Sequence, residues 1–191
     1  MPPRLLLSLV LILTFSTSAP AGIVSIPIKD TITLPADDKP GSVPTILRLN
    51  VDDRGVICLS ARAHEYVGIT FTEPQTLDFI AALQKSLPLI ASARSAGVKK
   101  KQLLASFGLN PRVELINISY VADNFGENAG TQLNIGNPKL IEKQSYRLTP
   151  ENTTALITLL QQVPAALTRA RDLHVQTQST PLFTVPTPPA K

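Results

Sequence analysis

The sequence predicts an α+β fold in which antiparallel sheets are covered by helices. Two observations lead to this fold class. Runs of alternating apolar and polar residues have the length of β-strands, and each group of runs is followed by a capped segment with helical spacing. The second such segment, from Tyr146 to Arg171, resembles the first, from Ile69 to Arg94. We therefore expect two tandem groups, each of two or three strands followed by a helix that covers its sheet.

The first 21 residues have the features of a secretory signal peptide. Arg4 precedes an apolar run from Leu5 to Phe15, and Ala19 and Ala21 occupy the small-residue positions before a cleavage site. A run of this length, at about 1.5 Å per residue, is too short to cross a membrane core of roughly 30 Å. We expect residues 1–21 to be removed and the mature protein, without a transmembrane segment, to be exported.

The mature chain is expected to contain one compact domain. Residues 22–44 form a lead-in, in which alternation typical of an edge strand precedes a loop. The domain is expected over residues 45–174, with half-repeats at 45–97 and 112–174. Residues 175–191 contain four prolines and are expected to form an extended, proline-rich tail.

The domain is expected to open with a β-hairpin. Leu47, Leu49 and Val51 alternate with polar residues, and the turn "DDRG" leads into a second run that begins at Val56. One face of this second run is apolar and is assigned to the core: Ile57, Leu59, Ala61, Ala63, Val67, Ile69 and Phe71. The run is too long for one strand, so an interruption is expected near Glu65 to Gly68.

The opposite face of this run supplies the candidate binding residues, which are Ser60, Arg62, His64 and Tyr66. Arginine and tyrosine are enriched at the energetic centres of protein interfaces, and a sheet face that bears both can receive a partner. The same polar face is equally typical of a solvated surface.

The first helix is expected to begin at Thr72, with Pro74 in its first turn and Gln75 completing a capping box. Pro88 should kink or end it. Further strands are expected at 113–122, 131–136 and 142–148 before the second helix.

The second helix repeats the first at an offset of 77 residues, which takes Thr72 to Thr149. The other matching pairs are Thr76 and Thr153, Ile80 and Ile157, Leu83 and Leu160, Gln84 and Gln161, Ala93 and Ala170, and Arg94 and Arg171. Internal duplication explains this match. Convergence explains it too, because every helix start and apolar helical face obeys the same physics.

Charge does not indicate a nucleic-acid partner. Loss of Arg4 with the signal peptide reduces 18 basic residues to 17 against 14 acidic ones, a net charge of +3. The densest basic stretch comprises Lys99, Lys100 and Lys101, which is a weak candidate for contact with an anionic surface.

No constellation for catalysis or metal binding stands out. Cys58 is the single cysteine, so no disulfide forms within the chain. On a straight strand Cys58 and His64 would lie nearly 20 Å apart, at about 3.3 Å per residue, too far for a catalytic dyad. The second histidine, His174, lies far away in sequence. We expect no metal and no cofactor.

These observations favour a non-enzymatic, exported binding protein that contacts another protein of the envelope or extracellular space. An envelope assembly factor, an inhibitor or an immunity-type protein would fit. Two alternatives stay open: a small exported hydrolase whose site is assembled only in three dimensions, and a protein that binds an anionic polymer or membrane surface. Because the body has about 170 residues and no disulfide, a bacterial envelope is the expected setting.

Overall fold

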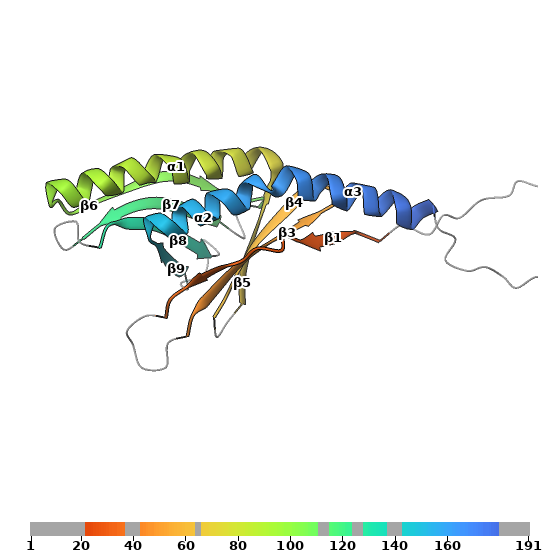
Figure 1. Ribbon diagram of the computed structural model, residues 1–191, viewed down its shortest axis with the longest axis horizontal. Helices are drawn as coiled ribbons and strands as arrows, with labels where there is room; N and C mark the ends of the chain where they lie inside the picture. The colour runs from red at the N-terminus through yellow and green to blue at the C-terminus, as the bar shows by residue number, and fades with distance from the viewer. Residues whose placement is uncertain are drawn as a thin grey trace, which may run out of the picture.

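The computed structural model describes residues 22–36, 43–63, 66–110, 115–123, 128–136 and 143–179. The expected signal peptide lies outside these residues. The predicted fold class is confirmed, since two antiparallel sheets carry helices on one side (Figure 1).

The first sheet is built from the N-terminal strands. The lead-in supplies two short strands, which both pair with β3, so the order is β1-β3-β4-β5 with β2 beside β3. The bounds are β1 (Ser25–Pro27), β2 (Ile32–Leu34), β3 (Thr45–Asp52), β4 (Val56–Arg62) and β5 (Tyr66–Thr72). The expected interruption falls between β4 and β5, so the long alternating run does form two strands.

The second sheet is a meander in the order β6-β7-β8-β9. Its strands are β6 (Lys100–Phe107), β7 (Leu115–Ala122), β8 (Gly130–Gly136) and β9 (Lys143–Leu148). The sequence pattern missed β6, since no strand was expected between residues 97 and 112. A β-bulge between Leu103 and Ala105 interrupts the register of β6. The consecutive Leu103 and Leu104 therefore break the alternating pattern by which a strand is recognised in a sequence.

The helices cover the sheets in an exchanged arrangement. The elements are α1 (Glu73–Ala96), α2 (Pro150–Gln161) and α3 (Val163–Ser179). The first helix follows the first sheet but packs mainly on β6, β7 and β8 of the second, whereas α3 follows the second sheet and packs on β3 of the first (Figure 1). Each group therefore covers the other group's sheet, which corrects our expectation that each helix covers its own.

The two sheets share one apolar core. The predicted core residues Ile57, Leu59, Ala61, Ile69 and Phe71 are all fully buried. Where the sheets meet, three phenylalanines from β5, α1 and β6 pack edge to face, and their ring centroids are 5.3 to 6.0 Å apart: Phe71, Phe79 and Phe107. Such contacts fix ring geometry as well as burying area.

The predicted helix caps form. The Gln75 side chain accepts a hydrogen bond from the Thr72 backbone N–H at 2.9 Å, and the Gln75 N–H donates back to the Thr72 hydroxyl at 3.5 Å. Thr149 likewise accepts from the Asn152 N–H. These bonds satisfy backbone donors that have no partner inside a helix.

The two prolines act differently. Pro164 lies in the first turn of α3, after a break at Gln162. Pro88, however, lies within a continuous α1, so of the two expected effects, a kink or an end, the end is wrong. Both Pro88 and Gln84 are exposed, so water can hydrogen-bond to the Gln84 carbonyl that loses its intrahelical donor.

The last helix is longer than the sequence pattern predicted. It reaches Ser179, so residues 175–179, which we assigned to the tail, are helical. The stretch "VQTQS" contains no glycine or proline to stop the helix. The rest of the expected tail lies outside the described residues.

Candidate functional site

The outer face of the first sheet contains only part of the predicted binding set. Arg62 is exposed and lies opposite Ile46 on β3 and the backbone of Tyr66 on β5. Ser60 faces the same way but is only 4% exposed, and its hydroxyl donates to the Arg48 carbonyl at 3.4 Å. Ser60 therefore has a structural role. The side chains of His64 and Tyr66 lie outside the described residues.

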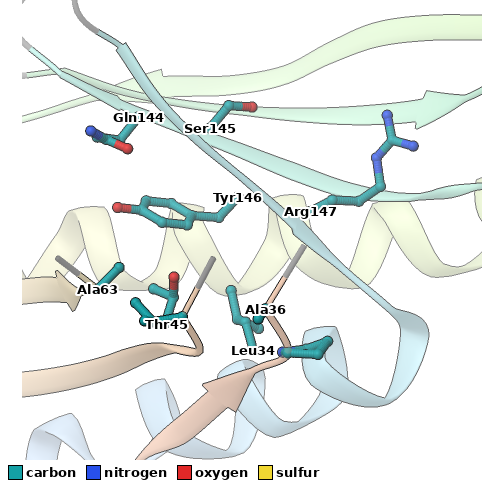
Figure 2. Close-up of a pocket in the computed structure, with 10 residues that line it drawn as sticks. Leu34, Ala36, Thr45, Ala63, Gln144, Ser145, Tyr146 and Arg147 are labelled. Atoms are coloured by element: carbon teal, nitrogen blue, oxygen red, sulfur yellow. The ribbon is translucent and has the colours of Figure 1, made fainter. Parts of the chain in front are cut away.

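A cleft lies where the first sheet approaches β9. Its volume is about 300 Å³. The first sheet contributes Leu34, Pro35, Ala36, Val43, Thr45 and Ala63, and β9 contributes Gln144, Ser145, Tyr146 and Arg147. Arg62 directly precedes Ala63 in the chain but is not among the residues that line the cleft. We call this feature the β9 cleft (Figure 2).

The wall formed by β9 is the edge of a sheet. This strand is the last of the second sheet and pairs with β8 along one side. Residues of both alternating orientations line the cleft, as expected when the opening lies at the strand edge. An edge strand presents backbone N–H and C=O groups that a further strand can pair with.

Tyr146 dominates the interior of the β9 cleft. Its ring lies between β9 and the segments that carry Thr45 and Ala63 (Figure 2). Burial raises the pKa of the Tyr146 phenol above its ordinary value of 10.0, because the phenolate is poorly solvated there. At neutral pH the hydroxyl is thus protonated and can donate or accept a hydrogen bond.

The guanidinium of Arg147 is already paired with groups that do not line the β9 cleft. Its guanidinium points away from Tyr146 (Figure 2), forms an ion pair with Asp123 at 2.9 Å and donates to the Asn128 carbonyl. The neighbouring Ser145 accepts a hydrogen bond from the Gln132 side chain. These contacts hold β9 against β8 and fix the position of the cleft wall.

The chemistry of the β9 cleft suits binding. Its ten lining residues supply hydroxyls, one amide and one guanidinium, but no histidine, cysteine or carboxylate. Hydroxyl, amide and guanidinium groups can all hydrogen-bond to a bound partner. Within the described part of the chain, no cluster of three or more potential metal ligands occurs.

The histidine that the structure describes has a different environment. His174 on α3 contacts Asp53 in the β3–β4 turn and lies 2.7 Å from the Gln178 amide. The Asp53 side chain is 7% exposed. Neither residue lines the β9 cleft, the cavity between α1 and β6, or the one beside α2. The pair joins α3 to the first sheet.

The remaining candidates are separate from the β9 cleft. Lys99, Lys100 and Lys101 are exposed at the start of β6. Cys58 is partly buried on the outer face of β4, between Asn50 and Thr70 of the flanking strands. No helix in the described ranges is long and apolar enough to cross a membrane.

No protein-family model and no curated protein matches this chain. Among solved structures, the crystal structure of Trypanosoma bruciei MRP1/MRP2 is similar. The alignment covers 81% of this chain and 98% of that chain, with 11% sequence identity and a TM-score of 0.34. A likeness at this level carries no conclusion about function.

Sequence reasoning missed Tyr146 as a site residue. The run "EKQSYRL" indicated a strand, but its pattern gives no sign that this strand is an edge facing another sheet. A signal was present only in composition, since an aromatic flanked by polar residues is well suited to a binding surface.

Proposed function

We propose that this protein is an exported, non-enzymatic binding protein that recognises another protein of the envelope or extracellular space through the β9 cleft and the exposed Arg62 at the end of β4. The observation that carries the proposal is their adjacency. The arginine that sequence analysis selected as a binding residue directly precedes Ala63, and Ala63 lines a cleft that contains a tyrosine.

Physical chemistry supports this pairing. Arg62 is exposed, and no carboxylate among the described residues forms an ion pair with it. A partner carboxylate can bind such a guanidinium bidentately. Tyr146 offers an apolar ring and a polar hydroxyl in one rigid side chain, the combination that interfaces favour.

The test compares matched variants as bait. Purified protein is incubated with an envelope and secreted fraction, washed at moderate salt, and the bound proteins are quantified by mass spectrometry. We expect Arg62→Ala and Tyr146→Ala each to reduce capture of the same stoichiometric protein at least tenfold. Arg169→Ala, which changes an exposed arginine of α3, serves as the control.

Equal capture by wild-type protein and both folded cleft variants would overturn the assignment of this surface. Export has its own test. The intact mass of the protein recovered from a secreting host should correspond to cleavage after Ala21, and recovery of the uncut chain inside the cell would contradict export.

A further inference from the structure

Within the described part of the chain, one flank of α1 is left uncovered beside the edge strand β6. The buried face of this helix covers the second sheet, and α2 and α3 pack beside it (Figure 1). A different flank of α1 forms a groove of about 440 Å³ together with β6. Because β6 is the last strand of its sheet, this groove lies at the margin of the sheet. The flank is therefore accessible to another molecule.

Two opposite charges lie on this flank, two helical turns apart. Asp78 and Lys85 both line the groove, and both are exposed. Residues seven apart share one face of a helix and are separated along its axis by about 10 Å, at about 1.5 Å per residue. They are too far apart to pair with each other, and neither forms an ion pair elsewhere in the described ranges. The flank thus offers one carboxylate and one ammonium group to a partner.

The residues between these charges suit contact with a second helix. Ala81, about midway between them, also lines the groove and is exposed. Leu77, one turn before Ala81, is 66% exposed. The distance between packed helices depends on the side chains at the contact, so an alanine allows a close approach. Covering the exposed leucine would remove apolar surface from water.

This pattern of charges is complementary to itself. In an interface with two-fold symmetry, a contact between one residue and another always occurs twice, once in each direction. Where two copies of α1 run antiparallel and cross at Ala81, Asp78 of one copy lies level with Lys85 of the other. The reciprocal contact forms on the other side of the axis. A second copy of the chain therefore satisfies both charges at once.

The edge of β6 is less suited to pairing than this helix flank. Lys100 and Lys101 are exposed on the strand, and a β-bulge between Leu103 and Ala105 interrupts its register. Lysines and bulges are the features by which natural edge strands avoid pairing with other edges. Association through α1 is therefore favoured over a sheet that continues from one copy into the next.

We propose that the protein forms a two-fold symmetric homodimer in which the α1 helices of two copies pack antiparallel across Ala81, joined by reciprocal Asp78–Lys85 ion pairs. This inference does not depend on the proposed function, because Arg62 and the residues of the β9 cleft lie outside α1. Exposed ion pairs contribute little affinity, so their main effect is to set the partner and the register. Burial of Leu77 supplies apolar area.

The test reverses each charge separately. Sedimentation equilibrium of the purified protein over a range of concentrations gives the dissociation constant of the dimer. Asp78→Lys places lysine against lysine at both contacts, and Lys85→Asp places carboxylate against carboxylate. Each should raise the dissociation constant at least tenfold, because like charges that face each other across an interface repel. The double variant exchanges the two charges and should restore dimerisation.

Mixing the two single variants is the decisive measurement. In a heterodimer of Asp78→Lys with Lys85→Asp, both contacts join a lysine to an aspartate, so two proteins that associate poorly alone should bind each other. Matched controls are Asp172→Lys and Arg169→Asp, which reverse exposed charges of α3 and should leave the dissociation constant unchanged. Circular dichroism confirms that each variant is folded.

The possible outcomes are distinct. Recovery of the dimer in the double variant and in the mixture would support the reciprocal pairs. A wild-type protein that stays monomeric at every concentration would overturn the dimer. A dimer whose dissociation constant is unchanged by the charge reversals, or single variants that fail to associate when mixed, would overturn the assignment of the interface to α1.

Discussion

The hydroxyls of Thr153 on α2 and Thr131 on β8 lie 3.0 Å apart, and both residues are fully buried. The Ser86 hydroxyl of α1 lies 2.6 Å from the same Thr131 oxygen. Ser86 and Thr153 also hydrogen-bond to carbonyls of their own helices, those of Leu83 and Thr149. One threonine of the second sheet therefore joins the helices of both halves through polar contacts inside an apolar core.

Replacing Thr131 by valine should destabilise the protein, because the shape is kept while the shared hydroxyl is lost. The expected cost is about 1–2 kcal/mol in the free energy of unfolding, the range for a buried hydrogen bond. Urea denaturation measures it. Thr131→Ser keeps the hydroxyl and removes a methyl group, so it should retain the contacts to both helices. A valine variant as stable as wild type would contradict the role assigned to this network.

The helices show which features a sequence reveals and which it does not. The caps at Thr72 and Thr149 and the inward face of β4 depend on local spacing, so they could be predicted. The packing of α1 on the second sheet could not, because both sheets offer apolar faces and no residue of α1 encodes a preference between them. Pro88 does not end the helix, because Gln84 is exposed and water can bond to the carbonyl that loses its donor.

The candidate site was predicted in part for the same reason. The exposure of Arg62 could be predicted because strand parity is local, and Ser60 was wrongly expected to be available because burial on an outer face depends on neighbouring strands. Tyr146 and Ala63 meet only when β9 approaches the first sheet. That approach depends on contacts between residues far apart in sequence, which periodicity does not report.

Gly130 should be required for the position of β9. A Cβ atom at this residue would lie 2.6 Å from the Leu148 carbonyl oxygen, a backbone atom that cannot move alone. Gly130→Ala should therefore push β8 and β9 apart and cost about 1–3 kcal/mol in stability, as overpacking does. Urea unfolding and amide exchange of residues 143–148 measure both effects. Gly22→Ala is the control, because nothing lies within 4 Å of its added Cβ. An equal effect of the two substitutions would contradict the close approach.

His174 should hold the second half of α3 against the β3–β4 turn. The substitution His174→Ala removes the imidazole and leaves the buried Asp53 carboxylate without this partner. The free energy of unfolding should fall by about 1–3 kcal/mol. Amide exchange should show faster opening of α3 beyond residue 170 with little change in α1. Asp172→Ala alters an exposed neighbour on the same helix and should have little effect. Unchanged exchange in His174→Ala would show that the contact does not anchor the helix.

The raised pKa of Tyr146 predicts how the stability of the fold changes at alkaline pH. Burial raises its pKa in the folded state above the ordinary value of 10.0, so the folded protein holds the phenol proton more tightly than the unfolded chain does. The stability this provides is fully present below pH 10 and is lost as the pH rises through the folded-state pKa. Tyr146→Phe cannot ionise at this position and should lose less stability than wild type between pH 9 and pH 11, measured by urea unfolding at each pH. Parallel pH profiles for the two proteins would mean that the phenol is not shielded from water in solution, and the β9 cleft would then be more open than its geometry indicates.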